Sequence, residues 1–100
     1  MPRPLDKETL AQVAPKLSEL TADVLFNDIW QRQELSRRER SLITLATLTA
    51  LGRTGQLPWH INFALSNGLE RKEIVEVFTH LAFYAGWPAA VSALECLPEE

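Results

Sequence analysis

The stretch that decides the fold is SRRERSLITLATLTAL, residues Ser36 to Leu51. Ser36 and Glu39 have the spacing of a capping box, in which two side chains bond the free backbone N–H groups at the start of a helix. The helix is predicted to run to about Gly52. Apart from three threonines its residues from Leu42 onward are apolar, so apolar side chains lie almost all round it. Such a helix is buried on every side, and in so small a chain we expect another subunit to supply part of that burial.

Helical spacing continues on both sides of this stretch. No segment shows the period-two alternation of a strand, so the predicted fold class is all-α with about six helices. Gly52-Arg53-Thr54-Gly55 reads as a connection, and Pro15 must interrupt or restart the first helix. The predicted helices cover residues 4–15, 17 to before 33, 36–52, 58–67, 71–85 and 88–96. The core face of the helix 71–85 is Ile74, Val77, Phe78, Leu81, Ala82 and Ala85.

The composition limits the classes of protein to consider. One hundred residues make one domain. A net charge of −3 argues against a nucleic-acid binder. No apolar run reaches the roughly 20 residues that cross a bilayer, and the N-terminal residues do not read as a signal peptide. The single cysteine, Cys96, excludes an internal disulfide, so we expect a cytoplasmic protein that binds neither nucleic acid nor membrane.

His60 is the first candidate for chemistry. With Pro58 at the first helical position, His60 lies in the first turn, where free N–H groups disfavour a positive charge. The neutral imidazole is therefore favoured, and it can donate a hydrogen bond to a developing oxyanion or pass a proton. The alternative is a structural histidine that anchors two helices.

His80 is the second candidate. Glu76 lies four residues before it and Tyr84 four residues after it, so the three side chains share one stripe of a helix. Glu76 can orient or charge the imidazole, and Tyr84 can donate a hydrogen bond. The alternative is a solvated helix face, although the neighbouring aromatic residues Phe83 and Trp87 indicate a second buried contact or a pocket wall.

The arginines are candidates for binding an anion. Arg37 and Arg38 lie in a first helical turn, where positive charge opposes the helix dipole. Salt bridges to the carboxylates Asp28, Glu34 and Glu39 are the preferred explanation, and a bound anion is the alternative. Arg53 differs because it stands in the glycine-flanked connection before His60. Its guanidinium can hold a carboxylate by two parallel hydrogen bonds, which makes Arg53 the preferred anion anchor.

Metal and thiol chemistry are both disfavoured. A metal site needs three or four converging ligands, and two histidines on separate helices with Glu76 do not supply them. Nucleophilic thiol chemistry needs an activated cysteine, usually with a resolving partner. Cys96 stands alone near the end of the last helix and is expected to be inert.

Three blocks of sequence carry a resemblance to a known family. They are LSRRERSLI (35–43), HINFALSNG (60–68) and YAGWPAA (84–90), with EIVEV (73–77) between the last two and FNDIWQR (26–32) ahead of all of them. In order and spacing they resemble the carboxymuconolactone decarboxylase family, over residues 24–97. The resemblance implies one all-α, alkylhydroperoxidase D-like domain over residues 1–100, with its core in 17–97, that assembles as a ring-like homo-oligomer, commonly a hexamer.

The resemblance also implies an activity. Members of this family decarboxylate gamma-carboxymuconolactone to the beta-ketoadipate enol-lactone without a cofactor, in the breakdown of protocatechuate. A second branch of the superfamily, the alkylhydroperoxidase D-type proteins, carries a Glu, a Cys-x-x-Cys pair and a His. With that His laid on His60, the cysteine positions fall on Arg53 and Gln56 and the Glu position on Ser41. Peroxidase activity is therefore not expected.

The residues can be given roles in such a decarboxylation. Arg53 would hold a carboxylate, and His60 would stabilise the dienolate or protonate it. His80, supported by Glu76 and Tyr84, would be a second acid or a carboxylate partner. Trp59 and Phe63 would line an apolar pocket for the departing carboxylate. The alternatives are an enzyme for a related lactone or keto acid, and a non-catalytic helical oligomeric binding module. We expect the site to lie near a subunit interface.

Overall fold

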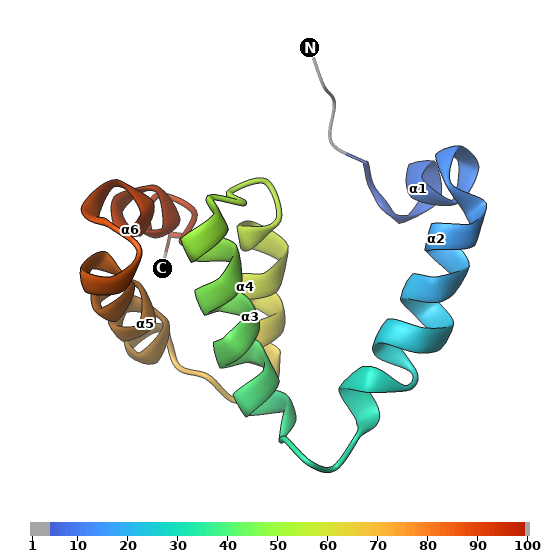
Figure 1. Cartoon of the computed structure of the whole chain (residues 1–100), viewed down its shortest axis with the longest axis horizontal. Coiled ribbons are helices and arrows are strands. Elements are labelled where there is room, and N and C mark those ends of the chain that lie inside the picture. The colour runs from blue at the N-terminus through green and yellow to red at the C-terminus, as the bar shows by residue number, and fades with distance from the viewer. Residues whose placement is uncertain (1–4, 100) are drawn as a thin grey trace. The chain divides into compact units, whose positions relative to one another are not determined.

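The computed structural model describes residues 5–99, and every regular element in that range is helical (Figure 1). Pro4, where the first predicted helix begins, lies outside the described residues. Contacts divide the chain into two compact units, Met1–Ser36 and Arg37–Glu100. No helix within residues 5–99 is long and apolar enough to cross a membrane. The elements are α1 (Lys7–Val13), α2 (Pro15–Leu20), the π-helical segment η1 (Thr21–Phe26), the 3₁₀ turn η2 (Ile29–Gln31), α3 (Arg37–Leu51), α4 (Leu57–Ser66), α5 (Arg71–Tyr84) and α6 (Trp87–Leu94).

In the first unit, α1 ends at Val13 and α2 begins at Pro15, which confirms that the proline interrupts the helix. Asp6 caps α1, because its carboxylate accepts the N–H of Thr9 at 2.8 Å. The helix predicted from Leu17 to before Gln33 is helical throughout most of that range but is not one regular helix. It widens into η1 and, after a turn, tightens into η2, whose Trp30 is buried.

In the second unit, the glycines mark the ends of helices. Gly52, Gly68 and Gly86 all have positive φ, of 70°, 99° and 109°, which is the backbone region that favours glycine after a helix. The helix α3 begins directly after Ser36, as the capping box predicts. A second capping box, which the sequence analysis missed, opens α5. There the Glu73 carboxylate accepts the backbone N–H of Glu70 at 2.9 Å.

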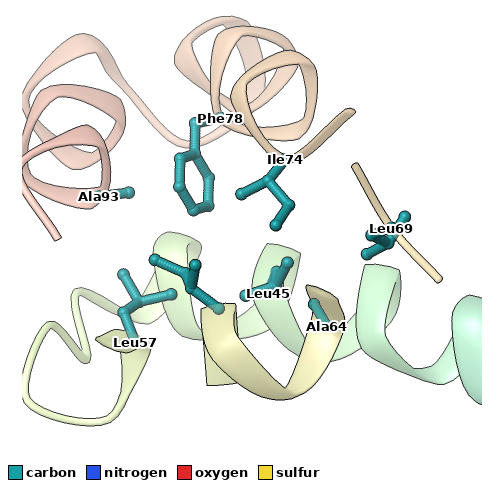
Figure 2. Close-up of a cluster of buried hydrophobic side chains, with 8 residues drawn as sticks. Leu45, Leu57, Ala64, Leu69, Ile74, Phe78 and Ala93 are labelled. Carbon is teal, nitrogen blue, oxygen red and sulfur yellow. The ribbon is translucent and has the colours of Figure 1, made fainter. Parts of the chain in front are cut away.

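The core of the second unit lies between α3 and α4 on one side and α5 and α6 on the other. Figure 2 shows Phe78 and Ile74 of α5 pointing toward Leu45 of α3 and the neighbouring residues of α4. Truncating a buried aromatic side chain such as Phe78 to alanine costs about 3–5 kcal/mol. The buried cluster is Leu45, Leu57, Ile61, Ala64, Leu69, Ile74, Phe78 and Ala93, and with the side chains packed against it the cluster lies within residues 42–97.

The helix α3 is buried along one stripe within the chain. Ser41, Leu45 and Thr49 are buried, at intervals of four residues. Ile43 is 52% exposed and Leu51 is 63% exposed. A single chain therefore does not bury this helix on every side, and cover from another subunit stays a prediction.

Candidate active site

Backbone hydrogen bonds connect the turn that carries Arg53 to the start of α4, which carries His60. The Arg53 N–H donates to the Leu48 carbonyl at 2.8 Å, so the turn continues from the end of α3. The Arg53 carbonyl accepts the Gln56 N–H at 3.2 Å, and the Gln56 carbonyl accepts the His60 N–H at 3.3 Å. Residues 53, 56 and 60 thus follow one another on successive turns. Helical side chains tilt toward the N-terminus, so the imidazole leans toward the turn that carries Arg53.

His60 is half-buried among aromatic rings on α4. Its ring centroid lies 4.9 Å from that of Trp59, edge to face, and 6.4 Å from that of Phe63. The Trp59 and Phe63 rings are themselves 5.0 Å apart. Burial lowers the pKa of His60 below its ordinary value, because imidazolium loses more hydration than the neutral ring. The side chain is therefore neutral at pH 7.

The neutral form agrees with the sequence prediction, but the local reason differs. The helix α4 begins at Leu57, so Pro58 is its second residue and not its first. The backbone N–H of His60 is already bonded to Gln56, and the pKa shift arises from burial. What the site offers chemically is a neutral imidazole beside apolar rings, with the exposed Arg53 seven residues earlier in the chain.

His80 lies in a different place, an open groove between α3 and α5 with a volume of about 430 Å³. The His80 ring stacks on Tyr84, with centroids 4.9 Å apart and planes 28° apart. Glu76 lines the same groove, so the predicted stripe of three residues does lie together. The lining residues are Arg38, Leu42, Ala46, Glu73, Glu76, Val77, His80 and Leu81. His60 is not among them, so the structure does not gather the two histidines at one cavity.

An ion pair that the sequence analysis missed joins the two walls of this groove. Arg38 at the start of α3 pairs with Glu73 at the start of α5. The pKa of Glu73 is lowered, first by the Glu70 N–H bond and then by Arg38. The partners suggested for Arg38 were carboxylates near it in sequence, whereas Glu73 is 35 residues away. A pairing over that separation depends on how helices pack, and the sequence gives no local signal for it.

The two regions differ in the charge that they offer a substrate. The groove holds two carboxylates, Glu73 and Glu76, and its arginine is already paired. An anionic substrate would meet two carboxylates there, and the arginine of the groove is engaged by Glu73. The turn before α4 instead carries the exposed Arg53, and the neutral His60 follows it on α4. Of the two regions, the one around His60 suits a carboxylated substrate better.

The part of the chain that the structure describes shows neither a cluster of metal ligands nor an activated thiol. Within residues 5–99, no group of three or more His, Cys, Asp or Glu side chains converges as a metal site would require. Burial, helped by the nearby charge of Glu95, raises the pKa of the Cys96 thiol. The sulfur therefore keeps its proton at neutral pH, in contrast to the thiolate that nucleophilic cysteines present.

The model of the carboxymuconolactone decarboxylase family matches residues 15–99. This chain belongs to that family. Arg53, His60 and His80 all lie within the match, as do the three sequence blocks that carry the resemblance. The family assignment from those blocks is therefore confirmed.

Two curated proteins are similar in sequence to this chain. The chain is 38% identical over 74 residues to the 4-carboxymuconolactone decarboxylase of Acinetobacter baylyi, and this alignment covers 74% of this chain and 55% of that protein. The chain is 34% identical over 76 residues to the nitrosuccinic acid decarboxylase of Metarhizium robertsii, and this alignment covers 76% of this chain and 53% of that protein. The chain thus spans about half the length of these relatives.

Proposed function

We propose that this family member is a carboxy-lyase that removes carbon dioxide from a small carboxylated acid. The observation that carries the proposal is the neutral, half-buried His60, flanked by Trp59 and Phe63 and preceded by Arg53. The relatives support the reaction type more strongly than the substrate. Both are named decarboxylases, but their names give different acids.

As the substrate we propose gamma-carboxymuconolactone, and as the product the beta-ketoadipate enol-lactone. Loss of carbon dioxide from this lactone leaves an electron pair that spreads through the ring to the lactone carbonyl oxygen. The substrate is thus its own electron sink, and we propose that the reaction needs no cofactor. What the protein must provide is a hold on the carboxylates, stabilisation of the dienolate and a proton for carbon.

In this proposal Arg53 and His60 divide the work. The Arg53 guanidinium holds the retained carboxylate by two parallel hydrogen bonds. The neutral imidazole of His60 donates its N–H to the lactone oxygen as negative charge develops there. That charge raises the pKa of the imidazole, so His60 can bind a proton from bulk solvent and pass it to carbon, where it replaces the lost carbon dioxide. Trp59 and Phe63 give the departing carboxylate an apolar surface, which favours neutral carbon dioxide.

We keep His80 as the second candidate acid or carboxylate partner, with Glu76 and Tyr84 beside it. The carboxylates of the groove rank it below His60, because they oppose the approach of an anion. The ranking would change if a second copy of the chain brought a cation to this groove.

We further propose that the chain assembles with copies of itself, as a hexameric ring, in the cytoplasm. Support comes from the aromatic patch of Phe83, Tyr84 and Trp87, which are 74%, 80% and 64% exposed. Exposed aromatic patches of this kind are typical of protein interfaces. A cytoplasmic protein would also keep its lone thiol, Cys96, reduced.

The test is turnover of gamma-carboxymuconolactone by the purified protein, followed by carbon dioxide release. We expect release in the wild type and its loss in His60→Ala, with both proteins folded and of equal mass in solution. Nitrosuccinic acid, assayed in parallel, separates the reaction type from the substrate. Release from nitrosuccinic acid only would correct the substrate. No release from either acid would refute the carboxy-lyase proposal and favour a non-catalytic binding module.

A further inference from the structure

The thiol of Cys96, in the turn after α6, contacts the turn that carries Arg53. Its sulfur lies 3.6 Å from the Thr54 carbonyl oxygen, across 42 positions of sequence, and 3.5 Å from the Ser92 carbonyl oxygen. Thr54 is the residue directly after Arg53. The contact therefore links the end of α6 to the anion anchor of the proposed site.

The turn itself has few internal constraints. It is flanked by Gly52, at a φ of 70°, and by Gly55, and a Cβ added at either glycine would meet no atom within 4 Å. Glycines in open space leave the backbone a wide choice of conformations. The N–H groups of Arg53 and Gln56 fix the two ends of the turn. The hydrogen bond from the Cys96 thiol to the Thr54 carbonyl constrains the middle of the turn.

The segment that carries Cys96 is firmly placed. Cys96 packs against the buried core cluster, and its backbone N–H donates to Ala93 at 3.0 Å. Two residues later, the Pro98 carbonyl accepts a hydrogen bond from the guanidinium of Arg71, at the start of α5. Cys96 is thus a fixed point from which a flexible turn can be held.

The protonation state of the thiol suits this contact. Burial raises the pKa of Cys96, and Glu95 adds to the shift, so the S–H proton is present at neutral pH. A thiol is a weak donor with one proton, and it can give that proton to the Thr54 or the Ser92 carbonyl. Part of the hold on the turn also comes from packing of the sulfur against it.

We propose that Cys96 is a positioning residue, whose thiol holds the Thr54 carbonyl and thereby fixes the turn that presents Arg53 to the substrate carboxylate. The role in catalysis rests on the function proposed above. The tie between the two segments does not, because it can be measured without any substrate.

The test uses the full chain with Cys96→Val, which keeps an apolar side chain and removes the donor, and Cys96→Ser, which keeps a donor. Ile74→Val is the control for general loss of stability, since Ile74 is buried in the core on α5 and lies outside both candidate sites. Amide hydrogen exchange at Arg53 and Gln56 reports on the turn, and KM and kcat for gamma-carboxymuconolactone report on Arg53.

For Cys96→Val we expect amide exchange at Arg53 and Gln56 to become several-fold faster, and KM to rise several-fold at nearly constant kcat. Cys96→Ser should recover part of both changes. Ile74→Val should change neither, at a similar loss in Tm. Unchanged exchange in Cys96→Val overturns the tie. Faster exchange with an unchanged KM, in a wild type that turns over, overturns the positioning role. If the wild type has no turnover, the proposed function fails, and the exchange rates still decide the tie.

Discussion

The two histidines of this chain occupy contrasting surroundings. His60 is half-buried on α4 beside the rings of Trp59 and Phe63, and burial lowers its pKa. His80 is exposed on α5, stacked on Tyr84 in a groove that also holds two glutamates. The same side chain is thus set up as a neutral hydrogen-bond donor in one region. In the other it is a solvated group among carboxylates.

The contrast teaches that the charge around a histidine affects its suitability for an anionic substrate as much as its burial does. An arginine on the turn before α4 accompanies His60, whereas the arginine near His80 is already paired with Glu73. A carboxylated substrate is attracted by the first arrangement and repelled by the second. Five predictions test or sharpen this comparison.

Replacing each histidine by glutamine should give the largest difference. We expect His60→Gln to lower kcat by about 100- to 10,000-fold, the usual contribution of a positioned acid or base. His80→Gln should lower it by less than about tenfold, because His80 is not among the groups proposed to meet the dienolate. Steady-state kinetics with gamma-carboxymuconolactone measures both. Equal losses in the two variants would mean that the regions act as one site.

Replacing the two arginines by glutamine should give the next largest difference. Arg53→Gln should lower kcat/KM by about 10- to 100-fold, since a hydrogen bond to a charged group contributes about 1.5–3 kcal/mol. Arg38→Gln should leave kcat/KM nearly unchanged, because its partner is Glu73 and not the substrate. Kinetics of the pair, with circular dichroism to verify folding, provides the check. A larger loss in Arg38→Gln would move the anion anchor to the groove.

Assembly can change the surroundings of His80. Tyr84 stacks on the His80 ring and also belongs to the exposed aromatic patch, so a subunit that covers the patch would also cover part of that region. We expect Phe83→Ser combined with Trp87→Ser to reduce the mass of the particle in solution, measured by light scattering. The control is Glu19→Gln, an exposed residue of α2 that lies outside the aromatic patch and off α3, and it should keep the wild-type mass. An unchanged mass in the double variant would place the interface elsewhere.

The smallest effect concerns pH. His60 has a lowered pKa, so the native protein takes up its proton only below the ordinary value of about 6.5, whereas the unfolded chain does so near 6.5. Between the two pKa values the unfolded state binds more protons, and the free energy of unfolding rises with pH. Urea titrations should show this rise over that window, and His60→Gln should weaken it.

The same pKa predicts an acid limb for activity. In the wild type, kcat/KM should fall only as pH drops through the lowered pKa of His60, since the neutral ring is the active form. Phe63→Ala exposes the imidazole and should move this limb upward, toward 6.5. A limb that stays in place would mean that Phe63 does not contribute to the burial of His60.

Much of the fold could be predicted from the sequence because its signals are local. The capping box at Ser36, the proline at 15 and the glycines at 52, 68 and 86 each act on neighbouring backbone, so they locate helix boundaries by themselves. The core face of α5 likewise follows from spacing, and Ile74 and Phe78 of that face are buried. The change of helix type at Thr21–Phe26 has no such signal in the periodicity.

The candidate site could be predicted only in part. The sequence alone determined the all-helical fold, the family, the two candidate histidines and the place of Arg53 just before α4, because these depend on residue type and short spacing. Only the tertiary structure decided that His60 and His80 lie in separate regions, that Arg38 pairs with Glu73, and that Cys96 reaches Thr54. The physical reason is that charge, burial and contact between residues 35 or 42 positions apart arise from helix packing, which no local pattern records.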